Sequence, residues 1–144
     1  METKVMFSSV NSEWGTPQPL FDRLEKIFGT FTLDAAASDS NAKCSNYYTI
    51  EDDALTKPWV GNVFLNPPYG RQIGRFVEKA YIEGCSGRGN RVVCLLPART
   101  DTRWFHDYCT KGEITFIRGR LKFNGVKWNA PFPNMVVVFG GNIK

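Results

Sequence analysis

The sequence predicts an α/β fold: an open sheet with antiparallel strands at one edge. In the first two thirds of the chain, short apolar runs typical of buried strands alternate with segments of helical apolar spacing. Near the C-terminus, residues 121–128 contain the pair Asn124-Gly125, the strongest short signal for a hairpin. A length of 144 residues suits one domain with a real core.

The first expected helix follows Thr16, which is placed to cap it, and begins at Pro17. Apolar residues line one face of this helix, and Gly29 ends it; they are Leu20, Leu24 and Ile27. Residues 1–12 show no sustained period, so we expect a flexible arm there and a single domain over 13–144.

The remaining elements are predicted from apolar spacing and from the residues that begin and end each segment. A short strand is expected over 31–33, ending at Asp34, and a loop over 35–48. Further strands are expected at 62–65, 91–96, 113–117 and 135–139, and helices at 72–80 and 102–109.

Charge and cysteine content narrow the classes of partner. The net charge of +4 suits a polyanion without requiring one. The four cysteines are scattered, without a CxxC spacing and with a single histidine, so no metal site is expected. The sequence shows no signal peptide and no apolar stretch of membrane-spanning length, so we expect a reducing, cytoplasmic location and no membrane partner.

The tetrapeptide Asn66-Pro67-Pro68-Tyr69, directly after the strand at 62–65, is the most informative motif. The lone pair of an amide or adenine NH2 is delocalised, and two acceptors facing its hydrogens would free that pair for an electrophilic methyl group. The Asn66 side-chain oxygen and the Pro67 carbonyl, held by the prolines, suit this task. Tyr69 offers a face for stacking. The alternative is a proline-stiffened turn, but the whole motif favours methyl transfer to a planar NH2.

Two carboxylates precede this motif. Asp34 ends the first strand, where ligands bind in open α/β sheets, and Asp53 lies shortly before the strand at 62–65. Either could accept hydrogen bonds from a ribose or an amino group. Taken singly, each would be interpreted as a helix cap or a loop residue. Their position upstream of Asn66 favours a ligand-binding role for Asp34 and Asp53, whereas for Asp52 the binding and the structural roles are equally favoured.

Together these motifs resemble the phage-type DNA N6-adenine methyltransferase family. The similarity runs in order through Trp14-Gly15-Thr16-Pro17, Leu33-Asp34-Ala35-Ala36-Ala37, Asp53-Ala54-Leu55, Trp59, Asn66-Pro67-Pro68-Tyr69-Gly70, 96–102, Trp104-Phe105 and 119–123. It implies a compact three-layer domain with a Rossmann-like class I methyltransferase sheet, mostly parallel with a C-terminal antiparallel hairpin. It also implies S-adenosyl-methionine as cofactor and adenine N6 of DNA as the methyl acceptor.

The resemblance also implies residue roles. Trp14, Thr16 and Pro17 would border the methionine end of the cofactor. Asp34 would hold its amino or ribose groups, and Asp53 its adenine. The tetrapeptide that begins at Asn66 would be catalytic and bind the target adenine.

One departure from the pattern concerns the turn after Asp34. Amino-methyltransferases usually have a glycine-rich turn there, but no glycine lies between Asp34 and Asp53. The sequence leaves two alternatives open, a compressed cofactor site or weak cofactor binding.

Basic residues predict the contact with double-stranded DNA. They follow two strand ends and are interpreted as phosphate contacts, the alternative being solvated surface charge; they are Arg99, Arg103, Arg118, Arg120 and Lys122. No insertion is long enough for a separate recognition domain, so the target site is expected to be short unless a homodimer adds contacts. Two other functions stay open, a glutamine-amide protein methyltransferase and a catalytically silent DNA-binding decoy.

Overall fold

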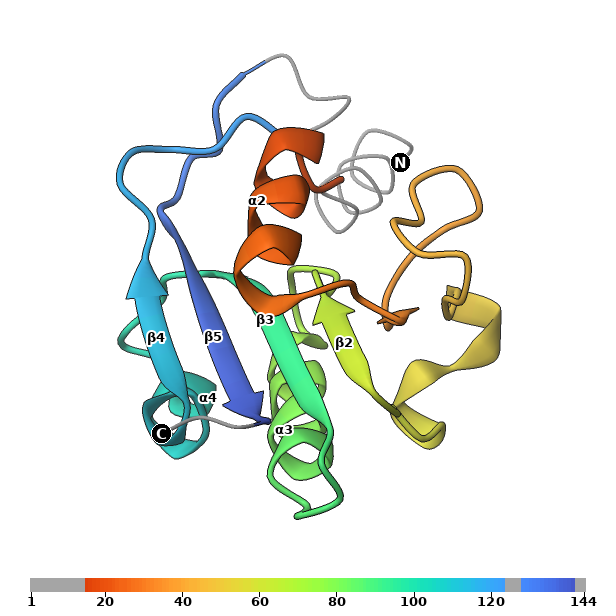
Figure 1. The fold of residues 1–144 in the computed structure, drawn as a ribbon. Coiled ribbons are helices and arrows are strands. Elements are labelled where there is room, and N and C mark those ends of the chain that lie inside the picture. The colour runs from red at the N-terminus through yellow and green to blue at the C-terminus, as the bar shows by residue number, and fades with distance from the viewer. Residues whose placement is uncertain (1–14, 124–127, 142–144) are drawn as a thin grey trace, which may run out of the picture.

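The computed structural model describes residues 15–123 and 128–141. These residues form a mixed α/β domain around a five-stranded sheet with the order β1-β2-β3-β5-β4 (Figure 1). The strands are β1 (Leu33–Asp34), β2 (Asn62–Leu65), β3 (Arg91–Pro97), β4 (Glu113–Phe116) and β5 (Asn134–Gly140).

The sheet has a parallel half and an antiparallel half. β1 pairs with β2 and β2 with β3 in parallel, whereas β5 is antiparallel to both β3 and β4. β4 therefore runs in the same direction as β3. The loops that follow β1, β2, β3 and β4 consequently all leave from the same edge of the sheet, the carboxyl edge, where open α/β sheets bind ligands.

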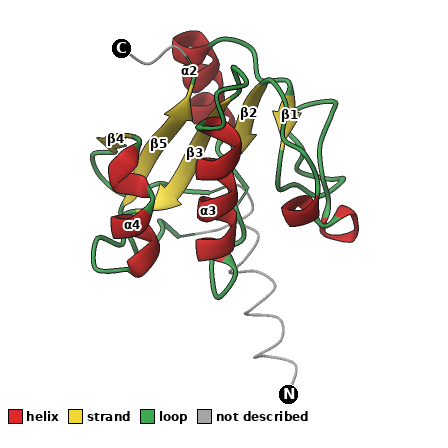
Figure 2. Ribbon diagram, turned by 90° about the horizontal axis from the view of Figure 1, so that it is seen from below, coloured by secondary structure: helices red, strands yellow, loops and turns green. Residues whose placement is uncertain are grey.

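Helices cover both faces of this sheet. Helix α2 (Gln18–Phe28) packs on one face, and α3 (Ile73–Gly84) and α4 (Arg103–Asp107) lie on the other (Figure 2). Three short 3₁₀ helices complete the described secondary structure, at Ile50–Asp52, Ala54–Thr56 and Cys109–Lys111. No helix in the described part of the chain combines the length and apolar character needed to cross a bilayer.

The central strands form the core. β3 is buried from its second residue onward and β5 up to its last, which explains why both are near-continuous apolar runs. On the α2 face, Phe21, Phe31 and Phe64 pack with ring centroids 5.1–5.5 Å apart. Trp59, the largest fully buried side chain among the described residues, donates its indole N–H to the Ala54 carbonyl oxygen at 3.0 Å.

Most predicted elements are confirmed, with three corrections. Pro17 rather than Thr16 is the N-cap of α2, so this cap makes no side-chain hydrogen bond to the helix end. Ile27, predicted on the buried face of α2, is 63% exposed because the inward stripe is carried by Phe21 and Leu24. The described flanks of the predicted hairpin, 121–123 and 128, are not strands, and the turn Asn124-Gly125 itself lies outside the described residues; the expected antiparallel strands at one edge are β5 and β4.

Candidate active site

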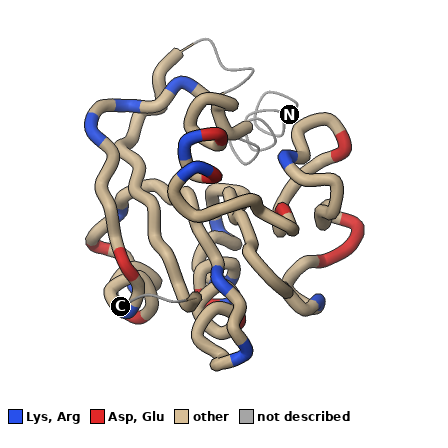
Figure 3. Tube along the Cα trace, viewed as in Figure 1, with Lys and Arg blue, Asp and Glu red and all other residues tan. Residues whose placement is uncertain are grey.

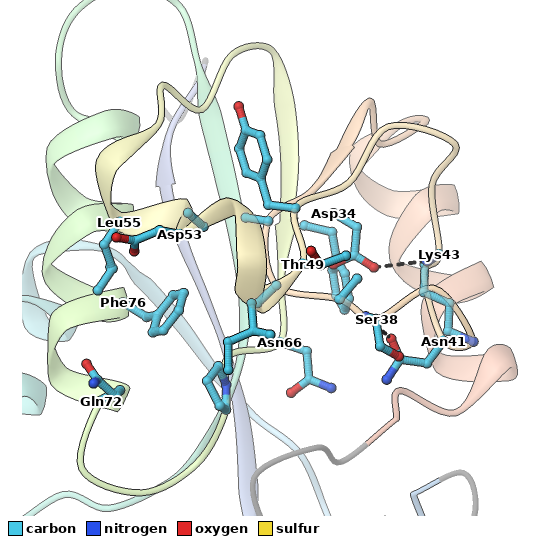
Figure 4. A pocket seen from close by; sticks show the side chains of 18 of the residues that line it. Asp34, Ser38, Asn41, Lys43, Thr49, Asp53, Leu55, Asn66, Gln72 and Phe76 are labelled. Atoms are coloured by element: carbon cyan, nitrogen blue, oxygen red, sulfur yellow. Dashed lines mark hydrogen bonds between the residues drawn. The ribbon is translucent and has the colours of Figure 1, made fainter. Parts of the chain in front are cut away.

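A cavity of about 500 Å³ opens at the carboxyl ends of β1 and β2. Its walls come from segments far apart in the sequence, so it forms only when the sheet is assembled. They are Gly15 and Thr16, the turn 34–38 with Asn41 and Lys43, residues 48–50 and 53–56, Phe64, Asn66 and Pro68, and Gln72, Arg75 and Phe76 at the start of α3 (Figure 4).

Asp34 forms the most buried charged part of this wall. Its side chain belongs to the last residue of β1 and is 3% exposed. One carboxylate oxygen, Oδ2, accepts the Lys43 backbone N–H at 2.9 Å, whereas Oδ1 is buried and has no hydrogen-bond partner among the described residues. Burial raises the pKa of Asp34 from 3.8 to about 6, although the backbone N–H groups of Lys43 and Ala36 act in the opposite direction.

Asp53 lines a different wall of the cavity from Asp34 (Figure 4). It joins two 3₁₀ helices and has φ of 54°, the only non-glycine residue with positive φ in the described part of the chain. The following turn is anchored because buried Trp59 donates to the Ala54 carbonyl. The exposed Asp53 carboxylate is thereby positioned by a fixed backbone rather than by side-chain packing.

Asn66 follows β2 and lies next to Thr16. The Asn66 Nδ2 donates to the Thr16 Oγ1 at 2.9 Å, across 50 positions of sequence. This bond sets the orientation of the amide, with its nitrogen toward Thr16 and its oxygen on the opposite side. The contact therefore joins a residue predicted to bind the cofactor with one predicted to bind the substrate amine.

Tyr69, at the end of the same turn, is not a wall of the cavity. Its side chain is 8% exposed and packs edge-on with Phe132 and Phe123, with centroid distances of 5.4 and 6.3 Å. Its hydroxyl donates to the Leu95 carbonyl at 3.4 Å and accepts from Asn134 at 3.3 Å. Burial raises the pKa of Tyr69, so the phenol is neutral.

The glycine-free turn after Asp34 is accommodated by alanine. Ala35 is fully buried and donates its backbone N–H to the Phe64 carbonyl, while the Ala37 N–H is bonded to the Tyr48 carbonyl. The peptide groups of this turn thus hold the strands and the loop together, and small methyl groups leave space for the cavity.

Residues 3–136 match the family model of the DNA N-6-adenine-methyltransferases (Dam). The chain belongs to this family. A DNA N-6-adenine-methyltransferase of Escherichia phage T1 is 41% identical over 116 residues, which cover 78% of this chain and 48% of that protein. One from Haemophilus phage HP1 is 35% identical over 115 residues, covering 76% of this chain and 65% of that protein.

This family member spans about half the length of its phage T1 relative. The predicted cofactor residues Thr16, Asp34 and Asp53 all line one cavity, together with Asn66 and Pro68 of the predicted catalytic turn. Pro17 caps α2 directly beside Thr16, and Trp14 lies outside the described residues. The roles of these residues stay predictions.

Sequence reasoning assigned no functional role to several side chains of the cavity. Phe76, Arg75 and Gln72 reach it from the first turn of α3, and Ile50, although 88% exposed, lines the same space. The apolar spacing over 72–80 predicts the helix that carries Phe76 but no role for this side chain. The closeness of α3 to the Asn66 turn in sequence was the signal that could have identified it.

The predicted DNA contacts lie on loops after β3 and β4. Arg118, Arg120 and Lys122 are exposed on the chain that leaves β4 at the carboxyl edge (Figure 3). Arg99 follows β3, and its guanidinium lies 5.7 Å from the centre of the Phe132 ring. Arg103 begins α4 and is also exposed.

Proposed function

We propose that this family member is an S-adenosyl-methionine-dependent methyltransferase acting on adenine N6 in DNA, with a Rossmann-like class I methyltransferase sheet. The observation that carries the proposal is the placement of Asn66 and Pro68 at one cavity with Asp34 and Asp53. A donor held by the two carboxylates would lie directly beside the turn that presents acceptors to the amine. Both phage relatives carry the name of this activity.

The residues of the cavity fit the cofactor. A volume of about 500 Å³ falls within the ~300–1,000 Å³ common for small-molecule sites. The buried Asp34 Oδ1, without a partner among the described residues, suits a hydroxyl or ammonium donor, and Asp53 suits the amino group of an adenine. Ile50, Leu55 and Phe76 supply apolar walls for a flat ring. The bound cofactor supplies an electrophilic methyl group on a sulfonium.

The Asn66 turn would act on the target amine. The Asn66 Oδ1 and the Pro67 carbonyl oxygen would each accept a hydrogen bond from one N–H of the target amine. The nitrogen lone pair would then be directed toward the methyl donor. Thr16 would hold the Asn66 amide by the observed hydrogen bond, so that this acceptor is preorganised before the substrate arrives. Since Tyr69 is almost fully covered, a base can stack on it only after neighbouring side chains move.

Double-stranded DNA would lie along the carboxyl edge. Arg99, Arg118, Arg120 and Lys122 leave from strand ends near the same edge as Asn66, and Arg103 follows on α4. Contacts of this kind position the duplex without reading its sequence. We propose residues 13–144 as the catalytic domain, with 1–12 as an arm, working in the cytoplasm of a host cell.

Transfer of labelled methyl from S-adenosyl-methionine tests this function. The protein should label unmethylated DNA, and digestion should yield N6-methyladenine, whereas Asn66→Ala should label nothing while still binding the cofactor. Label in a protein glutamine instead of DNA would favour the protein methyltransferase. DNA binding without any transfer would favour the decoy.

A further inference from the structure

Asn134 lies where three strands meet at the carboxyl edge. It begins β5, stands opposite Pro97 of β3, and accepts the Ile117 backbone N–H through its carbonyl at 2.9 Å. Its side chain is 1% exposed.

The side-chain amide of Asn134 has two acceptors. Its Nδ2 donates to the Tyr69 hydroxyl oxygen at 3.3 Å and to the Leu96 carbonyl at 3.1 Å. The Leu96 carbonyl fixes the orientation of the amide, because the opposite orientation would place two oxygens against each other.

Packing alone does not account for an asparagine here. Its Oδ1 is buried and has no hydrogen-bond partner among the described residues, which costs folding free energy. An apolar side chain would avoid that cost. What asparagine provides here and an apolar residue would not is the two hydrogen bonds to Tyr69 and Leu96.

The bond to Tyr69 fixes the far end of the Asn66–Tyr69 turn. At its near end, β2 and the bond from Asn66 to Thr16 hold the turn. Between them, Pro67 and Pro68 restrict φ, so a displacement of Tyr69 is transmitted to Asn66. The Tyr69 hydroxyl also donates to Leu95, so that both of its hydrogen-bonding roles are used.

We infer that Asn134 is a positioning residue which, by holding the Tyr69 hydroxyl, keeps the Asn66 and Pro67 oxygens in place for the target amine. The inference rests on the proposed function for its catalytic consequence. Asn134 is not among the residues that line the cofactor cavity, and its side chain is buried. Its loss should therefore lower the turnover number and leave the affinities for cofactor and DNA nearly unchanged.

Kinetics of Asn134→Ala, Tyr69→Phe and the double variant test this inference. Tyr69→Phe removes only the hydroxyl, so it breaks the same bond without leaving a cavity. Misplacement of reacting groups by about 1 Å can cost ~100-fold in rate, and we expect kcat to fall about 10- to 100-fold in each single variant. The double variant should lose little more, since both changes remove one interaction. Asn90→Ala is the matched control, because Asn90 is a buried amide whose oxygen accepts the Gly61 N–H at the opposite end of β3.

A second readout does not depend on the activity. In ¹⁵N-labelled protein, the side-chain amide signals of Asn66, assigned by their loss in Asn66→Asp, should shift in Asn134→Ala and in Tyr69→Phe but not in Asn90→Ala. Unmoved Asn66 signals would overturn the positioning role even if the protein methylates nothing. Wild-type kcat in a folded Asn134→Ala or in Tyr69→Phe, or losses that multiply in the double variant, would also overturn it and leave the proposed function intact. Absence of transfer by the wild-type protein would instead count against the function alone.

Discussion

Replacement of Asp34 by Asn should stabilise the protein at neutral pH while it abolishes cofactor binding. The carboxylate is buried, and the pKa of Asp34 is raised from 3.8 to about 6. Since each pKa unit corresponds to about 1.36 kcal/mol, the ionised side chain destabilises the fold by about 3 kcal/mol. An amide keeps the acceptor for the Lys43 N–H and removes the charge.

The pH dependence gives this prediction its sign. Because the folded protein holds the Asp34 proton more tightly than the unfolded chain, the stability of the wild type falls as pH rises from the unfolded pKa of 3.8 to the folded pKa of about 6. The Asp34→Asn variant has no carboxyl group at this position, so its stability does not fall with pH for this reason. The advantage of the variant should therefore be small at pH 4, grow by about 1.4 kcal/mol between pH 5 and pH 8, and then stay constant.

Urea unfolding of both proteins at pH 5, 6 and 8, without cofactor, measures this difference. Other titrating groups are common to both proteins and cancel. Asp53→Asn, which neutralises an exposed carboxylate of the same cavity, is the matched control for the loss of one negative charge from the cavity. An Asp34→Asn protein no more stable than wild type at pH 8 would refute the reasoning, because it would show that the folded protein compensates the buried charge.

The cofactor should reverse the order of stability. A ligand that binds only the folded state stabilises by about 2.7 kcal/mol at 100 times its Kd. S-adenosyl-methionine should thus raise the melting temperature of the wild type and leave that of Asp34→Asn nearly unchanged. An equal shift in both would remove Asp34 from the cofactor site.

Three further predictions concern the remaining groups. Asn66→Ala should lower the methyl-transfer rate about 100-fold or more with nearly unchanged cofactor affinity by calorimetry; wild-type turnover would end its assignment. Asp53→Ala should weaken S-adenosyl-methionine binding by roughly 1–3 kcal/mol, and unchanged affinity would move the adenine contact elsewhere. Arg118→Ala and Arg120→Ala should each reduce the affinity for all DNA sequences alike. Each should also lower the slope of log affinity against log salt concentration by about one, as expected for the loss of one phosphate contact; a loss confined to one target sequence would mean base readout instead.

The predictable parts of the fold depend on local patterns. Strands at 62–65 and 91–96 were predicted with boundaries within a residue of those observed, because they are buried on both faces and their sequences are continuously apolar. The same reasoning placed Asp34 and Asn66 at strand ends. Because β1 and β2 are neighbouring parallel strands, their carboxyl ends, and with them Asp34 and Asn66, lie side by side.

The parts that could not be predicted depend on pairings distant in sequence. The buried strand β5 lies between β3 and the mostly exposed β4, and the periodicity of a strand does not specify which other strands it pairs with. The covering of Tyr69 by Phe123 and Phe132 follows from this pairing, since both rings belong to the connection between β4 and β5. The motif identified Tyr69 as functional but contained no information on its neighbours.

Two features that stability would not select lie at the same edge. Asp34 and Asn134 each bury a side-chain oxygen without a hydrogen-bond partner among the described residues, on β1 and β5 respectively. Elsewhere in the core, buried polar side chains such as Glu83 and Asn90 are bonded to backbone N–H groups. Violations of polar satisfaction are expected where a sequence is constrained by function. Their position on both sides of the Asn66 turn therefore supports the proposal of one continuous site, in which Asp34 would bind the cofactor and Asn134 would hold the turn that acts on the target amine.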